Sequence, residues 1–318
     1  MRKKESEKLP GMNTETRKSP RPLDFSYSRM TMYEECPLRF KFRYVDRIPE
    51  KPKYYFAFGH SVHNALEFLY NVKSPPFPSM DEMLASFERD WNSASWDKKG
   101  YLSAEKAEAD FIEGRRMLTA YYRKHHASMQ VPLAVEYKTS LKIDGLSVMS
   151  VVDRIDYAGD GSIVISDYKT GKNVKRDPDQ LHMYQKICET DPGIKELVKA
   201  RFGAAESEDI RVGKLVFCHV PTLKESFFER SPAVELGKFW ERVLGVAGSI
   251  TAGRFDPTPG ERQCKFCDYK KFCPIFAEGA VPPAAHPKRV EEEEPVSGEE
   301  ALGALADRYG DLREELHS

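Results

Sequence analysis

Two runs with acidic residues carry the most specific chemistry in the sequence. Asp153 stands in the apolar run 146–157, and Asp167 and Lys169 close the run 162–169. Because side chains alternate between the faces of a strand, pairing of the two runs could bring Asp153 and Asp167 together, with Lys169 just beyond. Two adjacent carboxylates repel unless a cation lies between them, and hard oxygen ligands suit Mg²⁺ or Mn²⁺. A lysine facing the same site can orient a water molecule or stabilise charge on a phosphate. The alternative interpretation is an exposed ion pair at the end of a strand.

Three cysteines near the end of the predicted fold form a second candidate site. Cys264, Cys267 and Cys273 have the spacing Cys-x2-Cys-x5-Cys, which offers three soft ligands within ten residues. A tetrahedral site needs a fourth ligand. Cys188 lies in a helical pattern and Cys218 in a strand pattern, so both favour burial as small hydrophobic residues. Cys36, where Pro37 is expected to interrupt a helix, is the better fourth ligand. The spacing of the cysteines allows either zinc or a [4Fe–4S] cluster.

The elements around these residues change from helical to strand-like and back. Ser28 is expected to cap a short helix, which Cys36-Pro37 interrupts because the residue before a proline disfavours helical geometry. Asp144-Gly145 between two alternating runs is a strong hairpin signal. The pattern predicts helices over 59–70, 81–91, 104–125, 180–189 and 234–251, and strands over 133–143, 146–157, 162–169 and 214–220. This order favours an α/β or α+β domain with a mixed sheet.

Composition limits the class of protein. The 318 residues, 40% of them hydrophobic, are enough for a sizeable core and exclude a fibrous or wholly disordered chain. No apolar run reaches about 18 residues, so we expect no membrane span. The first residues are charged with no apolar run behind them, which predicts no export signal, a cytoplasmic location and reduced thiols or metal-bound cysteines.

Both ends differ in composition from the middle. Residues 1–22 and 279–318 are predicted to be flexible tails around a single folded domain at 23–278. The second tail holds 10 acidic and 4 basic residues, so the remaining 278 residues carry a net charge of +5. A mildly basic body with an acidic tail is compatible with nucleic-acid binding.

The acidic runs resemble the PD-(D/E)XK nuclease superfamily, and specifically its RecB-like exonuclease branch. That branch has an Asp-Arg-Ile-Asp-like run followed by Asp-Tyr-Lys-Thr-Gly, and Asp153-Arg154-Ile155-Asp156 and Asp167-Tyr168-Lys169-Thr170-Gly171 stand here in matching form. The resemblance implies a restriction-endonuclease-like core, with a mixed central sheet flanked by helices. The implied activity is metal-dependent hydrolysis of DNA phosphodiester bonds by an exonuclease, at single strands or DNA ends, in repair, recombination or related DNA processing.

The resemblance also implies roles for individual residues. Gly59 and His63 match a Gly-x-x-x-His helix whose histidine joins the metal site, and Gln180 and Tyr184 match a Gln-x-x-x-Tyr motif that positions DNA and the active-site strand. The implied ligands of Mg²⁺ or Mn²⁺ are His63, Asp153, Asp167 and the Tyr168 carbonyl, and the implied catalytic group is Lys169. Glu136 occupies a strand position where relatives commonly carry an acid.

The cysteines extend the resemblance. AddB-type helicase–nucleases and CRISPR-associated adaptation exonucleases carry one early cysteine and a late Cys-x2-Cys-x5-Cys around an iron–sulfur cluster. Cys36, Cys264, Cys267 and Cys273 match that arrangement, which implies a [4Fe–4S] staple joining the two ends of the domain. The implied partners are DNA and a helicase or other DNA-processing protein. Two alternatives stay open: a catalytically silent iron–sulfur DNA-binding subunit, and an interaction module with structural zinc.

Overall fold

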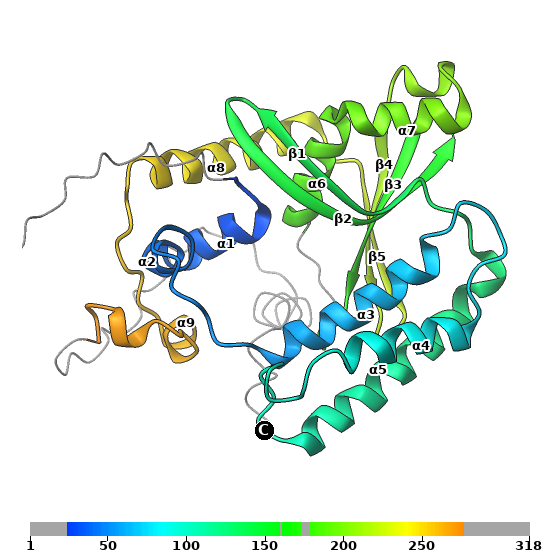
Figure 1. Ribbon diagram of the computed structural model, residues 1–318. Coiled ribbons are helices and arrows are strands. Elements are labelled where there is room, and N and C mark those ends of the chain that lie inside the picture. Colours follow the sequence, from blue (N-terminus) through cyan, green and yellow to red (C-terminus); the bar gives the residue numbers. More distant parts are fainter. Residues whose placement is uncertain (1–23, 160, 173–177, 277–318) are drawn as a thin grey trace, which may run out of the picture.

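A five-stranded mixed sheet forms the centre of the computed structural model, which describes residues 24–159, 161–172 and 178–276 (Figure 1). The strand order is β1-β2-β3-β4-β5; β3 and β4 are parallel and all other neighbours are antiparallel. The strands are β1 (Ala134–Ile143), β2 (Leu146–Gly159), β3 (Ser162–Lys169), β4 (Arg211–His219) and β5 (Lys224–Glu229). The predicted α/β architecture with a mixed sheet is confirmed, while both predicted tails lie outside the described residues.

Nine α-helices surround the sheet in the described part of the chain. They are α1 (Tyr27–Glu35), α2 (Pro37–Phe40), α3 (Tyr54–Tyr70), α4 (Met80–Trp91), α5 (Ala104–His125), α6 (Asp179–Thr190), α7 (Pro192–Phe202), α8 (Ala233–Thr251) and α9 (Glu261–Lys265). Local sequence explains several of their starts. The Ser79 hydroxyl and the Glu82 carboxylate form a capping box at α4, and the Ser103 hydroxyl caps α5.

The β1–β2 hairpin confirms the turn signal in the sequence. Ile143 pairs with Leu146, and Asp144 and Gly145 between them have φ angles of 49° and 80°. Positive φ at both central residues is the geometry of the two-residue turn that asparagine or aspartate followed by glycine favours.

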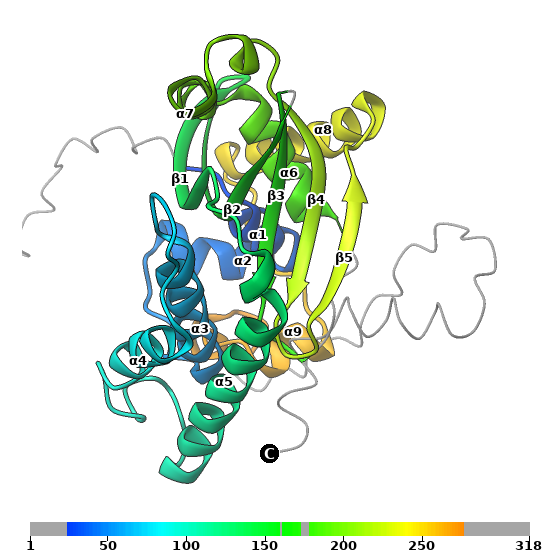
Figure 2. The same cartoon turned by 90° about the vertical axis from the view of Figure 1, so that its right-hand side faces the viewer.

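Helices cover the two faces of the sheet in different places. On one face, Ile165 and Phe217 pack with Leu181 of α6 and Ile194 of α7 in a core with no solvent exposure. On the other face, α3, α4 and α5 pack together beside the end of β3, where Tyr168 joins their core (Figure 2). The end of β3 therefore lies between α3 and α6, the two helices expected to carry site residues.

The two ends of the described chain meet beside the sheet. In Figure 1, α9 lies next to α2, although more than 200 residues separate them. The Tyr269 hydroxyl donates to the Ile48 carbonyl at 3.0 Å, and the rings of Phe42 and Tyr269 lie 5.6 Å apart. A separate core joins α1 and α2 to the end of α8. This packing forms a small unit around the predicted cysteine site.

Several boundaries differ from the sequence prediction. Helix α1 is capped by Ser26, whose hydroxyl accepts from the Arg29 amide, and not by Ser28. Helix α3 begins at Tyr54, five residues before the predicted start at Gly59, because aromatic residues of its first turns pack on α5 and its neighbouring loop. Helix α7 and strand β5 were not predicted; α7 does carry a local signal, an Asp191 cap followed by Pro192 in the first turn.

No helix in the described ranges is both long and apolar enough to cross a membrane.

A glycine of α5, at its contact with α4, provides a test of the packing between these helices. A Cβ added at Gly114 would lie 2.4 Å from Phe87 Cζ, whereas one added at Gly245 in α8 would meet no atom within 4 Å. Alanine in place of glycine favours a helix interior by about 1 kcal/mol, but overpacking costs about 1–3 kcal/mol. We expect Gly114→Ala to lower the free energy of unfolding in urea by about 1 kcal/mol. The matched variant Gly245→Ala should raise it, and a stabilised Gly114→Ala would contradict the packing.

Candidate functional site

The register of β2 and β3 places two acidic residues directly across from each other on neighbouring strands. Arg154 pairs with Ser166 and Ile155 with Ile165, so the same register puts Asp153 opposite Asp167. The backbone N–H of Tyr168 donates to Asp153 Oδ2 at 2.6 Å. The structure therefore brings together the two carboxylates that the sequence analysis placed in one site.

Asp167 is almost completely buried, with 2% of its surface exposed. Its Oδ1 accepts hydrogen bonds from Gln180 Nε2 at 2.9 Å and from the Tyr184 hydroxyl at 3.0 Å. Its Oδ2 lies 2.6 Å from Lys169 Nζ, yet no described residue offers it a well-aligned hydrogen bond. Burial raises the pKa of Asp167, and the Lys169 ammonium opposes that shift. A buried carboxylate oxygen with this incomplete set of partners fits a position beside a cation.

Helix α3 brings an imidazole to the same place. His63 Nδ1 lies 3.5 Å from Asp153 Oδ2 and 4.0 Å from Glu136 Oε1. One ligand atom from each of these three residues lies within 4.8 Å of the others. Two carboxylate oxygens and an imidazole nitrogen are donors that suit a divalent ion such as Mg²⁺ or Mn²⁺. Asp167, a further predicted ligand, stands opposite Asp153 on the neighbouring strand.

Glu136 is the member of the group whose role the sequence left open. It stands opposite Asp153 by the β1–β2 register and has a φ of 44°, an uncommon backbone conformation for a glutamate. The available signal was that Glu136 is the only acid within β1. A strained backbone at a site residue is consistent with a functional demand on its direction.

The mutual electrostatics of the group shift two pKa values. Burial lowers the pKa of His63, but the carboxylates of Asp153, Asp167 and Glu136 outweigh it and raise that pKa to about 9. Burial and the neighbouring Asp153 raise the pKa of Glu136 to about 7, against the opposing effect of His63. Without a metal, the His63 imidazolium therefore supplies positive charge that a bound cation would replace.

Helix α6 holds the lysine and the buried aspartate in a shared network. Gln180 and Tyr184 lie one turn apart, and Gln180 Nε2 donates to both the Tyr184 hydroxyl and Asp167. The Gln180 Oε1 atom accepts from Lys169 Nζ at 2.8 Å. Burial and the nearby Asp167 carboxylate raise the pKa of Tyr184 well above its usual value, so its hydroxyl stays protonated as a donor. These contacts orient Asp167 and Lys169.

A buried histidine anchors the chain directly after Lys169. The Val220 amide donates to the Lys169 carbonyl at 2.9 Å. His219, paired with Lys169 across β3 and β4, has its Nε2 at 2.7 Å from the Gly171 carbonyl and its Nδ1 at 2.6 Å from Thr222 Oγ1. Because a carbonyl only accepts, His219 Nε2 carries the proton of that bond. The sequence analysis missed His219, since its partner is set by strand pairing and not by a motif.

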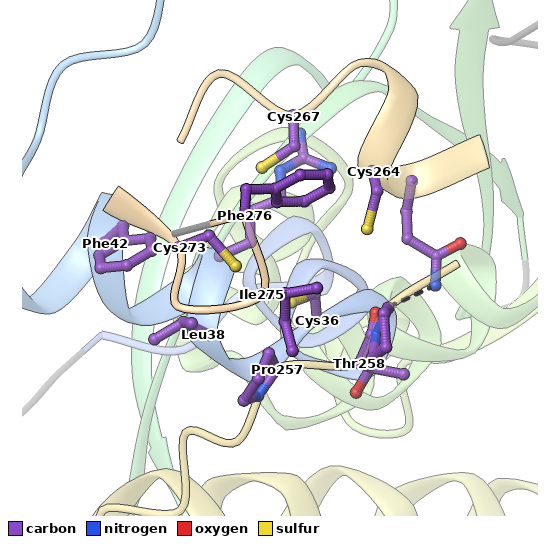
Figure 3. A pocket seen from close by; sticks show the side chains of 13 residues that line it. Cys36, Leu38, Phe42, Pro257, Thr258, Cys264, Cys267, Cys273, Ile275 and Phe276 are labelled. Atoms are coloured by element: carbon purple, nitrogen blue, oxygen red, sulfur yellow. Dashed lines mark hydrogen bonds between the residues drawn. The ribbon is translucent and has the colours of Figure 1, made fainter. Parts of the chain in front are cut away.

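The four predicted cluster cysteines line one cavity. Cys36 begins the turn into α2, Cys264 lies on α9, and Cys267 and Cys273 follow it. Figure 3 shows the four side chains around a common space, with Leu38, Phe42, Pro257, Ile275 and Phe276 beside them. Cys188 is a buried residue of α6, and Cys218 on β4 is half-buried near α5, so neither belongs to this group.

The four thiols could hold either of two groups, a single zinc ion or a [4Fe–4S] cluster. A single tetrahedral zinc with bonds of about 2.3 Å would hold its sulfurs roughly 3.8 Å apart. Among the described residues, no three cysteine sulfurs lie mutually within 4.8 Å, whereas the His63, Glu136 and Asp153 atoms do. Thiolates bind both zinc and iron–sulfur clusters, so the donor set of this cavity fits either group.

Metal binding to the acidic site should depend on pH. A metal ligand must be unprotonated, so an ion has to displace the proton of His63 below about pH 9 and that of Glu136 below about pH 7. We expect the affinity for Mn²⁺ to rise from pH 6 to pH 9, and calorimetry in buffers of different ionisation enthalpy to show proton release. His63→Gln should release about one proton fewer at pH 8. Affinity that does not change with pH would contradict this ligand set.

This chain is similar to several known proteins. A sequence model of the PD-(D/E)XK nuclease superfamily matches residues 24–274. The Gene 69 protein of Mycobacterium phage D29 is 24% identical over 276 residues, which cover 79% of this chain and 96% of that protein. The Gene 69 protein of Mycobacterium phage L5 is 26% identical over 143 residues, 45% of each chain. A solved structure of a candidate exonuclease from Eubacterium rectale has 13% identity and a TM-score of 0.41, and the match covers 86% of this chain and 91% of that chain. Because the superfamily model spans most of the sequence, this chain belongs to the PD-(D/E)XK nuclease superfamily.

Proposed function

We propose that this protein is a metal-dependent DNA exonuclease that hydrolyses phosphodiester bonds at single strands or DNA ends. The observation that carries the proposal is the convergence of His63, Glu136 and Asp153 next to the buried pair of Asp167 and Lys169. A structural ion pair between Asp167 and Lys169 does not require a second and a third acid, Asp153 and Glu136, beside it. A hydrolytic site does, because the acids hold the cation that the reaction needs.

The residues of the chain divide the work between them. His63, Glu136 and Asp153 would hold Mg²⁺ or Mn²⁺ next to Asp167 and the Tyr168 carbonyl, and the bound ion lowers the pKa of a water molecule and stabilises charge on the phosphate. The Lys169 ammonium has three donors; Nζ donates to Gln180 Oε1 and lies 2.6 Å from Asp167 Oδ2 in an ion pair. These two contacts direct the remaining donor toward the attacking water or the phosphate. Tyr184 and Gln180 keep Asp167 in the orientation that this geometry needs.

The cysteine group fits a [4Fe–4S] cluster better than a single zinc ion. Support comes from the four thiols around one largely apolar cavity and from the match of Cys36, Cys264, Cys267 and Cys273 to the arrangement of cluster-bearing nucleases. Cys36 and Cys264 lie 228 positions apart, so a cluster would tie the start of the domain to its end. Its role would be structural, since metal-binding free energy contributes directly to folding.

The biological setting follows from the proposed chemistry. We propose DNA as the substrate, a helicase or other DNA-processing protein as partner, and DNA repair, recombination or a related pathway as the context. Reduced thiols and iron–sulfur ligation fit a cytoplasmic location.

The nuclease proposal predicts that the lysine is essential. Lys169→Ala should lower kcat on end-labelled DNA by at least about 100-fold, because it removes the donor directed at the reacting groups. Its melting temperature should fall, because buried Asp167 loses its ion-pair partner, so circular dichroism at the assay temperature has to show that the variant is folded. Lys195→Ala, an exposed lysine on α7, serves as the matched control and should retain full activity. Degradation that continues in Lys169→Ala, or in EDTA, would refute the site assignment, and an inactive wild type that binds DNA would favour the catalytically silent subunit.

The cluster proposal predicts a spectroscopic signature. Protein purified without oxygen should contain about four iron atoms and absorb near 400 nm, as expected for the thiolate-bound cluster. Cys264→Ala should lose iron and melt at a lower temperature, whereas Cys218→Ala should keep its iron, because Cys218 lies outside the cavity. Stoichiometric zinc in the wild type would replace the cluster with a zinc site.

A further inference from the structure

One face of α3 points into the active site along much of its length. His63 contacts Asp153, and Glu67 adds to the negative charge that raises the pKa of Glu136. Phe56 lies seven residues before His63, which is close to two turns, so it stands in line with these two residues. The opposite face of the helix is buried in the core through Val62, Ala65, Leu66 and Leu69, all with no exposure.

Phe56 differs from its neighbours in that its side chain is largely exposed in the part of the chain that the structure describes. Its side chain is 59% exposed, and its ring lies 4.7 Å from that of Tyr55, tilted by 54°. Along the helix axis it is about 10 Å from His63. Between the two, a Cβ at Gly59 would lie 3.0 Å from Thr170 Oγ1, which shows that this face of α3 passes close to the segment after Lys169. Phe56 therefore projects just beyond the edge of the catalytic site.

The segment that leads into α3 carries positive charge. Residues 36–53 contain six lysines and arginines and two acids, a net charge of +4. Two acids outside the segment, Glu35 and Asp268, pair with Arg39 and Lys53, so a surplus charge of +2 stands ahead of α3, a sign that suits a phosphate backbone. If a polynucleotide followed this segment toward the metal site, its bases would come next to the Phe56 ring.

We propose that Phe56 is a stacking platform for an unpaired base of the substrate, two or three nucleotides from the reacting phosphate. The inference rests on the proposed DNA substrate and names its class as single-stranded DNA. Aromatic side chains bind single strands by stacking on base faces, and each stacked base contributes about 1–3 kcal/mol. The faces of paired bases inside a duplex are already stacked, so Phe56 favours single strands over duplex.

Binding measurements separate this inference from the catalytic proposal. In the Lys169→Ala protein with EDTA, fluorescence anisotropy reports the Kd for a labelled single strand and for a blunt duplex. Phe56→Ala should weaken single-strand binding about 10-fold and duplex binding less than twofold. Phe227→Ala, a phenylalanine with 56% exposure on strand β5, is the matched control and should change neither. Phe56→Trp should show tryptophan quenching on addition of a single strand.

The outcomes divide cleanly. Equal effects of Phe56→Ala on both DNA forms, or no effect on single strands, would overturn the stacking role, provided that the melting temperature is unchanged. If Phe56→Ala lowers the melting temperature, the Phe56→Trp protein decides, because unquenched fluorescence at saturating single strand rejects the inference. Binding with stacking but without hydrolysis by the wild type would reject the proposed nuclease activity and leave the stacking site in place.

Discussion

The meeting of Asp153 and Asp167 across paired strands is an unfavourable contact that the surrounding structure has to compensate. Like charges at this separation repel, and burial makes ionisation of Asp167 harder still. The compensation comes from a lysine on the same strand, a backbone amide and an imidazole from another element. Each contributor is positively charged or a hydrogen-bond donor, and each is held by a different part of the fold. The site is therefore costly to the fold without a cation, which is the property expected of a metal-dependent centre.

The sheet explains how those contributors reach one point. Helices α3 and α6 pack on opposite sides at the end of β3, so His63 approaches Asp153 while Gln180 and Tyr184 approach Asp167. Strand β4 adds a further contact, because His219 Nε2 lies 2.7 Å from the carbonyl of Gly171, two residues after Lys169. Lys169 is thereby fixed before and after its own position, which limits the entropy lost when it meets the reacting groups.

One continuous segment of the chain connects the cysteine cavity to the start of α3. The chain passes from Cys36 through a basic segment to Phe56, and then to His63. Contacts such as the Tyr269 hydroxyl on Ile48 bind the end of the domain to this segment. A group that ties the thiols together would stabilise the segment that precedes the metal-binding helix. The proposed structural role of the cluster and the proposed path of the substrate thus depend on the same stretch of chain.

Much of this arrangement was readable from local pattern, because strand alternation, a two-residue turn and helix periodicity act over a few residues. The facing of Asp153 and Asp167, the hairpin at Asp144 and the buried side of α3 followed from such rules. The acidic role of Glu136 and the anchoring by His219 did not, because both depend on pairing between strands and on which side chains a bend in the backbone turns inward. The exposure of Phe56 likewise arises only once its helix has packed and no other described element covers it. Short-range periodicity specifies which faces are apolar, but the contacts between distant segments form only when those faces close on one another.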